Sequence, residues 1–183
     1  MDSYLNNIKK LLKYRKYELH QPTTSPNIGI FNLIATGIDS CSKKLCVYWA
    51  LRDDKIGVKE VRVLIDSIIK EEDVKTILIV TPEPITSFAQ RECLSRSKSN
   101  FKVELWNLHE FSFCVMEHIF QPKMSIISNK ERKRLFGDNT AHLPKILITD
   151  PVIKFLGGKK NQVVQVSRPF PDGNFVVIHR VII

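Results

Sequence analysis

Glycine is scarce in this sequence, and the glycines present form no nucleotide-binding loop. Only 7 of its 183 residues are Gly, and neither G-x-x-x-x-G-K-[S/T] nor G-x-G-x-x-G occurs. The G-x-S-x-G and His-Glu-x-x-His patterns of hydrolases are absent as well. The five histidines are scattered along the chain. We therefore expect no catalytic residue, no cofactor and no small-molecule ligand.

Cysteine is also sparse, and its spacing does not indicate a metal site. The four cysteines are Cys41, Cys46, Cys93 and Cys114, and no two of them form a Cys-x-x-Cys pair. Structural zinc sites draw their ligands from closely spaced pairs of Cys and His. We expect reduced, mostly buried thiols and no bound metal.

Long apolar runs are missing too. Residues 21–38 carry no charge, but they include two prolines, two glycines and several polar side chains. The N-terminus has no apolar core of the signal-peptide kind, and the five cations between Lys9 and Lys16 are expected on a solvated helix face. We expect no membrane partner.

Acidic residues are fewer than basic residues, 19 against 28. The chain carries a net charge of +9, and residues 117–183 hold 11 Lys and Arg against 5 Asp and Glu. A basic balance favours an acidic partner, nucleic acid above all. A net charge of this size is equally ordinary for a small soluble domain, so both interpretations stay open.

The apolar pattern predicts an α/β (α+β) fold in two domains, with residues 1–115 in the first and 116–183 in the second. In the first domain the pattern predicts a mixed sheet with helices packed on it. The expected helices cover residues 3–17, 58–69 and 86–94, and the expected strands cover 29–35, 45–51, 76–81 and 101–106. Residues 20–27 are expected to form a loop, and residues 39–44 a polar turn.

The second domain carries clear helix boundaries. Ser128 and Glu131 form a capping box that begins a basic helix, and Gly137 ends it. Asp150-Pro151 begins a second helix, which Gly157-Gly158 ends after about two turns. The segments on either side, residues 143–148 and 162–168, are apolar, and the second is expected to be a strand. Asp172-Gly173 then indicates a hairpin turn.

The segment from Leu143 to Arg168 resembles the C-terminal domain of the fifth, shared subunit of eukaryotic RNA polymerases, and is similar to the shorter archaeal counterpart of that protein. The motifs that carry the resemblance are L-P-K-I, D-P-V, K-F-L-G and K-K-N-Q-V-V-Q-V-S-R. His118, Pro122 and Lys123 match the family's H-x-L-V-P-K-H joint between two domains. Asn161 and Lys16 each stand where the family usually has Gly. The resemblance is strong from His118 to Arg180 and weak before residue 76.

The resemblance implies a non-catalytic subunit of a multisubunit DNA-dependent RNA polymerase. The family's C-terminal domain docks on the largest subunit of the enzyme, within an assembly of further subunits. The positions that match the family's motifs, and are expected to bind the partner, are His118, Pro122, Lys123, Leu143, Pro144, Asp150, Pro151, Lys154, Phe155, Gly157, Arg168 and Arg180.

The family's N-terminal domain is a jaw of nuclease-like topology, without an active site, that meets downstream double-stranded DNA. Its DNA-facing loop corresponds to Pro84, Thr86 and Ser87 here, with Ser87 in place of the family's proline. Arg91 and Arg96 follow this loop and are expected to reach phosphates. The resemblance implies the nucleus if the source is cellular, or a cytoplasmic virus factory and virion if it is a large DNA virus.

The last strand also indicates a partner, independently of any family. Its two faces are both apolar, although alternation normally gives one apolar face when only one side is covered. We expect one face to pack inside the small domain and the other to be covered by a protein partner or by the basic helix.

Two other functions remain open at this point. One is a free-standing basic protein that binds nucleic acid with a steep salt dependence. The other is a small Mg²⁺-dependent nuclease, for which Glu104 lacks the following lysine that such sites use. A carboxylate without such companions is expected on the surface.

Overall fold

The computed structural model describes residues 2–19, 23–25, 30–37, 44–50, 56–70, 74–97, 101–170 and 173–183. The chain divides into two compact units, Met1–Phe113 and Cys114–Ile183, which we call unit 1 and unit 2. Each unit combines helices with its own sheet, which confirms the α+β fold class. The sequence places its domain boundary two residues further on, after residue 115.

Unit 1 is built on a mixed sheet in the strand order β1-β3-β4-β5-β6, with β2 also paired to β3. The pairs that involve β1, β2 or β3 are antiparallel, whereas β4 pairs β5 and β5 pairs β6 in parallel. The parallel centre is buried on both faces, and β5 carries the continuous apolar run 77–80 there. The strands are β1 (Tyr17–Leu19), β2 (Thr23–Ser25), β3 (Ile30–Gly37), β4 (Lys44–Ala50), β5 (Val74–Thr81) and β6 (Lys102–Asn107).

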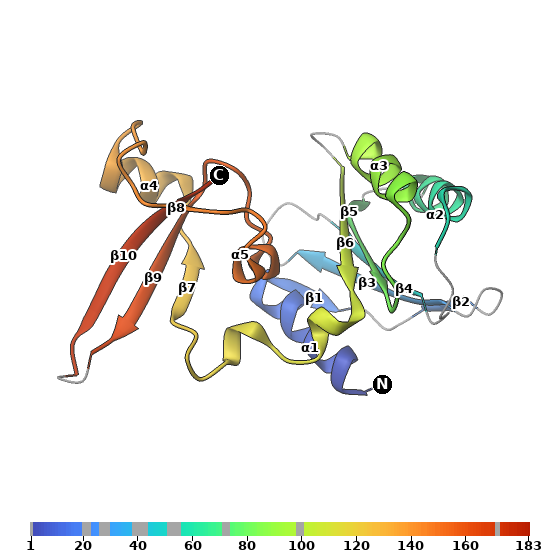
Figure 1. Ribbon diagram of the computed structural model, residues 1–183, viewed down its shortest axis with the longest axis horizontal. Helices are drawn as coiled ribbons and strands as arrows, with labels where there is room; N and C mark the ends of the chain where they lie inside the picture. The colour runs from blue at the N-terminus through green and yellow to red at the C-terminus, as the bar shows by residue number, and fades with distance from the viewer. Residues whose placement is uncertain are drawn as a thin grey trace. The chain divides into compact units, whose positions relative to one another are not determined.

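Helices cover both faces of this sheet (Figure 1). Figure 1 shows α2 (Val58–Lys70) and α3 (Ser87–Arg96) on one side and α1 (Asp2–Tyr14) on the other. Val61 and Ile65 of α2 share a buried cluster with Ile77 of β5, which lies on the face toward α2 and α3. Helix α1 buries Ile8, Leu11 and Leu12 at the 3.6-residue spacing of one helix face. A 3₁₀ turn, η1 (Leu108–Phe111), follows β6.

Unit 2 is a four-stranded sheet in the order β7-β9-β10-β8, with two short helices. The β7–β9 and β9–β10 pairs are antiparallel, and β8 pairs β10 in parallel. Ile153, Val164 and Ile182 form the centre of its core. The elements are η2 (Val115–Glu117), β7 (Lys123–Ile126), α4 (Asn129–Phe136), β8 (Lys145–Ile146), α5 (Pro151–Leu156), β9 (Val163–Pro169) and β10 (Phe175–Ile182).

The predicted helix boundaries of unit 2 are confirmed. Asp150 Oδ1 accepts hydrogen bonds from the backbone N–H groups of Val152 and Ile153, at 2.9 and 3.3 Å. Gly157 ends α5 in the left-handed conformation, with φ of 72°. Gly158 is required for a different reason, because a Cβ there would lie 2.6 Å from Ile153 Cγ2.

Local causes also fix the ends of α4 and the turn before β9. Ser128 Oγ accepts from the backbone N–H of Glu131 at 3.2 Å, and Gly137 ends α4. Asn161 has φ of 67°, the left-handed conformation that the family's glycine would provide. The strand that follows runs Val163–Pro169, close to the predicted 162–168.

Differences from the predicted elements of unit 1 lie near its N-terminus. The first helix ends at Tyr14 rather than Tyr17, because Lys16 adopts a left-handed φ of 60° and the chain then enters β1. Strand β2 lies inside the predicted loop 20–27, where the short run of Thr and Ser gives little apolar signal. Of the predicted turn 39–44, residues 39–43 lie outside the described residues, as does Asp172 of the predicted hairpin turn.

The last strand also departs from its prediction. Phe175, Val176 and Val177 are exposed on both faces of β10, whereas Val181 and Ile182 are buried on both faces. The first half of the strand is therefore exposed on both faces and its end is buried on both faces, whereas the prediction was one covered face along the whole strand. The cause is that β8 pairs only with the end of β10, through Val181 and Ile182, so the first half of the strand lies beside β9 alone.

Candidate functional site

A buried ion pair joins the turn after α1 to β6 in unit 1. Arg15 Nη2 lies 2.8 Å from Glu104 Oε2 and Arg15 Nη1 lies 3.2 Å from Glu104 Oε1, which is a two-point contact. The side chains of Arg15 and Glu104 are 5% and 9% exposed. Lys102 Nζ lies 2.9 Å from Glu104 Oε1, and Trp106 Nε1 donates to Glu104 Oε2 at 3.2 Å.

The electrostatics of this cluster hold Glu104 in its charged form. Burial by itself would raise the pKa of the Glu104 carboxyl, but Arg15 and Lys102 outweigh burial and lower it. The expectation of a surface carboxylate was therefore wrong. Its cations come from Arg15, which is 89 residues away in sequence, and from the residue two places before it on the same strand, not after.

The predicted DNA-facing residues of unit 1 surround the start of α3. Thr86 Oγ1 caps the helix by accepting from the backbone N–H of Ala89 at 3.3 Å. Pro84 and Ser87 are exposed beside it. Pro84 also lines a cavity of about 220 Å³, together with Thr81 and Asn107 at the carboxyl ends of β5 and β6.

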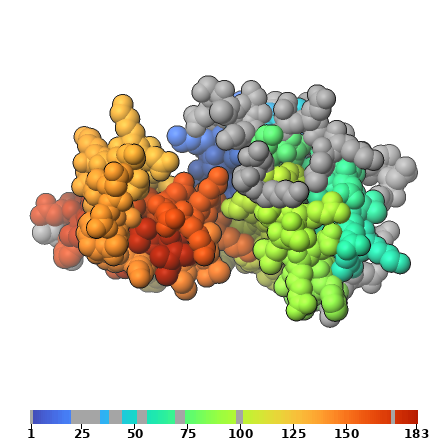
Figure 2. All heavy atoms as spheres, turned by 90° about the horizontal axis from the view of Figure 1, so that it is seen from above, coloured from blue at the N-terminus to red at the C-terminus, as the bar shows by residue number. Residues whose placement is uncertain are grey.

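The two predicted arginines of α3 differ in their surroundings. Arg91 is exposed, with its guanidinium carbon 5.9 Å from the ring centroid of Phe88. Arg96 instead contacts Asp66 through Nη1 and Glu92 through Nε, which ties α3 to the neighbouring α2. The hydrogen bonds from Arg62 and Arg96 hold the pKa of Glu92 below its usual value. Arg91 is therefore the better placed of the two arginines to meet a phosphate. Figure 2 shows the face of unit 1 on which α2 and α3 lie side by side.

Four of the predicted partner-binding residues form the framework of α5. Asp150, Pro151 and Gly157 set the ends of the helix, and Phe155 is only 2% exposed. Leu143 and Pro144 lead into β8, where the Pro144 carbonyl accepts from the N–H of Val181 at 2.9 Å. Their positions fit a role in shaping the unit, and any contact with a partner stays a prediction.

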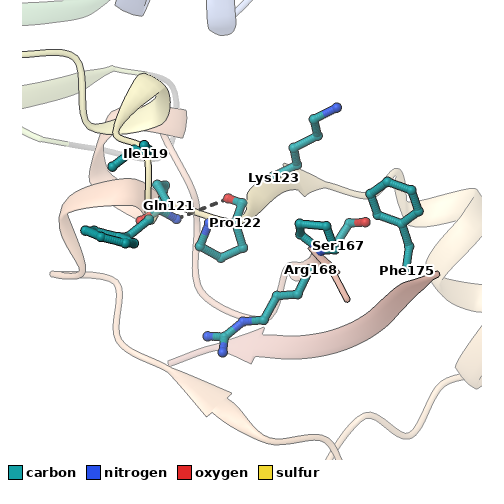
Figure 3. Close-up of a pocket in the computed structure, with 9 residues that line it drawn as sticks. Ile119, Gln121, Pro122, Lys123, Ser167, Arg168 and Phe175 are labelled. Atoms are coloured by element: carbon teal, nitrogen blue, oxygen red, sulfur yellow. Dashed lines mark hydrogen bonds between the residues drawn. The ribbon is translucent and has the colours of Figure 1, made fainter. Parts of the chain in front are cut away.

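The remaining predicted residues of unit 2 lie closer to its surface. His118 is exposed beside Phe120, with ring centroids 5.9 Å apart. Lys154 and Arg180 are half-buried. Pro122, Lys123 and Arg168 come together in a groove of about 440 Å³ (Figure 3). The residues lining the groove are Ile119, Phe120, Gln121, Pro122, Lys123, Ser167, Arg168, Pro169 and Phe175.

Sequence reasoning missed the apolar walls of this groove. Ile119, Phe120 and Phe175 are 87%, 86% and 62% exposed, which is unusual for side chains of this size. The sequence motif identifies the turn that carries Ile119 and Phe120 only as a joint between domains. Its exposure depends on where the β9–β10 hairpin ends, and no local pattern contains that information.

The cysteines within the described part of the chain are buried. Burial, with the charge of Glu92, raises the pKa of the Cys93 thiol to about 11, so Cys93 stays protonated near neutral pH. The other two described cysteines, Cys46 and Cys114, are buried as well, and Cys41 lies outside the described residues. Among the described residues we find no helix with the length and apolar character needed to span a bilayer, and no group of three potential metal ligands.

Comparison with known proteins assigns the chain to a family. The family model for the C-terminal domain of RNA polymerase Rpb5 matches residues 113–182. The RNA polymerase subunit Rpo5 of Methanothermobacter thermautotrophicus is 34% identical over 71 residues, which are 37% of this chain and 92% of that protein. The chain belongs to the RNA polymerase Rpb5 family. Its C-terminal unit is the part shared with the archaeal protein.

Eukaryotic members of the Rpb5 family align with more of the chain at lower identity. Subunit 5B of RNA polymerases IV and V from Arabidopsis thaliana is 24% identical over 145 residues, or 78% of this chain and 65% of that protein. The rpabc1 subunit of RNA polymerases I, II and III from Dictyostelium discoideum is 25% identical over 130 residues, covering 69% of this chain and 66% of that protein. The chain thus spans slightly less than two thirds of both relatives. The homologues support a non-catalytic polymerase subunit.

Proposed function

We propose that this chain assembles into a multisubunit DNA-dependent RNA polymerase, with unit 2 docked on the largest subunit and unit 1 acting as a jaw on downstream duplex DNA. Membership of the Rpb5 family is the observation that carries the proposal. The relatives that align with both units are named as subunits of eukaryotic polymerases. Other subunits of the same enzyme are the expected protein partners.

The two units support different parts of this role. Unit 2 exposes large apolar side chains around a groove and holds 11 Lys and Arg against 5 Asp and Glu in residues 117–183, features that fit a docking module. In unit 1, the loop at Pro84 and the exposed Arg91 offer a phosphate contact without any reading of bases. A nuclease is disfavoured, because Arg15, Lys102 and Trp106 already occupy the carboxylate of Glu104.

The test is the native size of the tagged chain in lysate from its source, with mass spectrometry of the proteins that travel with it. We expect co-elution with two very large polymerase subunits. Elution as a free 21.1 kDa monomer would contradict the proposal. Steep salt-dependent binding of that monomer to DNA would then favour a free-standing nucleic-acid-binding protein.

The location of the protein follows from its source. A cellular member would work in the nucleus, as expected for a eukaryotic polymerase subunit. A homologue from a large DNA virus would work in a cytoplasmic virus factory and be packaged in the virion. Immunofluorescence of the tagged chain distinguishes nuclear from cytoplasmic staining.

A further inference from the structure

The groove of unit 2 opens where β7 begins. Lys123, the first residue of β7, pairs with Ser167 of β9. Arg168 and Pro169 therefore extend β9 beyond the point where its pairing with β7 begins. The turn from Ile119 to Pro122 forms one wall of the groove, and Phe175 at the start of β10 lies on the opposite side (Figure 3). The volume of about 440 Å³ is enough for a few side chains of a bound molecule.

The rims of the groove are apolar and unusually exposed. Ile119, Phe120 and Phe175 each leave well over half of their surface in water. Binding is favoured when a partner covers this apolar surface and removes it from water. Three such side chains around one concave site are typical of a surface that binds another protein.

Both charges of the groove are positive. Lys123 and Arg168 line it, and no acidic residue does. Neither cation has an ion-pair partner among the residues that the structure describes. An Arg guanidinium binds a carboxylate through two parallel hydrogen bonds, so the groove is complementary to Asp or Glu side chains.

We propose that this groove binds a short segment of another polymerase subunit in which one or two carboxylates lie next to a large apolar side chain. The carboxylates meet Lys123 and Arg168, and the apolar side chain packs among Ile119, Phe120 and Phe175. This inference deepens the docking role of unit 2 and rests on that proposed function for the source of the segment.

Other occupants fit the groove less well. Nucleic acid is bound mainly through rows of cations, whereas the two cations here are outnumbered by exposed apolar side chains. A second copy of the chain would bring together two units in which Lys and Arg exceed Asp and Glu by 11 to 5, and like charges oppose such association.

A photo-crosslinking experiment tests the inference in the full chain. Phe120 is replaced by p-benzoyl-L-phenylalanine, an aromatic side chain at a position that is 86% exposed, and the tagged chain is irradiated in the cells that make it. Mass spectrometry then identifies the crosslinked segment. The same substitution at Leu147, which is exposed and does not line the groove, controls for non-specific crosslinking.

Charge reversal tests the role of the two cations. K123E/R168E is expected to reduce the crosslink about tenfold or more, since each lost charge contact and each new repulsion weakens binding. K159E/K160E makes the same change in net charge at two exposed positions outside the groove and should leave the crosslink unchanged. Thermal melting of both variants checks that the fold is retained.

Support requires a crosslink to a polymerase subunit, at a segment with both acidic and large apolar residues, that only K123E/R168E weakens. A crosslink to nucleic acid, to a second copy of the chain or to a segment without carboxylates would overturn the inference. So would equal loss in both variants, or no crosslink from a chain that co-elutes with polymerase. A crosslink to an acidic and apolar segment of an unrelated protein would retain the ligand chemistry but overturn the polymerase assignment.

Discussion

Replacing Glu104 with Gln removes the charge that Arg15 and Lys102 share inside unit 1. Arg15 would keep its charge in a nearly buried position and lose its ion pair with Glu104, so we expect a loss of about 3–5 kcal/mol in the free energy of unfolding. Urea denaturation followed by the tryptophan fluorescence of unit 1, which comes from Trp49 and Trp106, measures the change. Glu18→Gln, at an exposed position of β1, is the matched control and should change stability by less than about 0.5 kcal/mol.

The same carboxylate gives unit 1 a defined pH dependence. The folded-state pKa of Glu104 lies below the ordinary value of 4.5, because Arg15 and Lys102 outweigh the opposing effect of burial. A lowered folded-state pKa adds stability that is fully present above pH 4.5 and is lost as the pH falls through the lowered value. The stability difference between the wild type and Glu104→Gln should therefore narrow in acid. A difference that stays constant, or widens, as the pH falls below 4.5 would contradict this assignment.

His179 is a second residue at which a single atom is expected to affect the stability of the fold. Its Nε2 is buried without a hydrogen-bond partner among the described residues, while its ring meets Phe136 edge-on at 5.0 Å. His179→Phe keeps the ring contact and removes the unsatisfied atom, so we expect a gain of about 1 kcal/mol or more. His142→Phe, at an exposed position whose ring centroid lies 6.3 Å from that of Phe136, should leave stability within about 0.5 kcal/mol. Thermal melting compares the two, and a lower melting temperature for His179→Phe would show that water or another partner satisfies the imidazole.

At the scale of elements, α5 depends on Asp150, the residue that caps its N-terminus. The helix has only 6 residues. Asp150 Oδ1 accepts hydrogen bonds from the N–H groups of Val152 and Ile153 in its first turn. Asp150→Ala should cost about 1–2 kcal/mol, whereas Asp150→Asn retains an acceptor and should cost less. Urea denaturation of the two variants measures both values. Equal losses would mean that the charge of Asp150, not its hydrogen bonds, stabilises the helix.

Elements whose ends have local causes were predictable from the sequence. Asp150, Gly157 and Asn161 act through their own backbone conformation or through hydrogen bonds within three residues, so a short window contains the signal. The end of α1 was missed because Lys16 adopts a left-handed φ of 60° without being Gly. The uncovered half of β10 was missed because strand alternation describes two faces and says nothing about where a neighbouring strand stops.

At the scale of the whole molecule, both the groove and the buried ion pair combine residues that are distant in sequence. The groove joins the turn at Ile119 to the β9–β10 hairpin, and Arg15 reaches Glu104 across 89 residues. The sequence motifs identified Pro122, Lys123 and Arg168 one by one, but their position in one groove depends on the register of β7 against β9. In the same way, only the fold shows that Asp66 and Glu92 already engage Arg96.

That difference between the two arginines leads to a prediction for the assembled polymerase. Arg91→Glu should weaken retention on downstream duplex DNA and lower the salt slope of log K by about 1, as expected for the loss of one phosphate contact. Formation of phosphodiester bonds on pre-opened templates should continue at the normal rate, because the proposed jaw role involves holding DNA and no chemical step. Lys13→Glu is the matched control, since it makes the same charge change at an exposed position of α1, across the sheet from α3 (Figure 1).

Filter retention of the reconstituted enzyme over a salt series, beside transcription from a pre-opened template, measures both quantities. Equal weakening by Arg91→Glu and Lys13→Glu would mean that the jaw acts through its overall charge, with no particular contact at α3. Outright failure of transcription on the pre-opened template would contradict the jaw role. Arg96→Gln separates the arginines further: it breaks the ion pairs with Asp66 and Glu92 and so should alter the stability of unit 1 more than DNA retention.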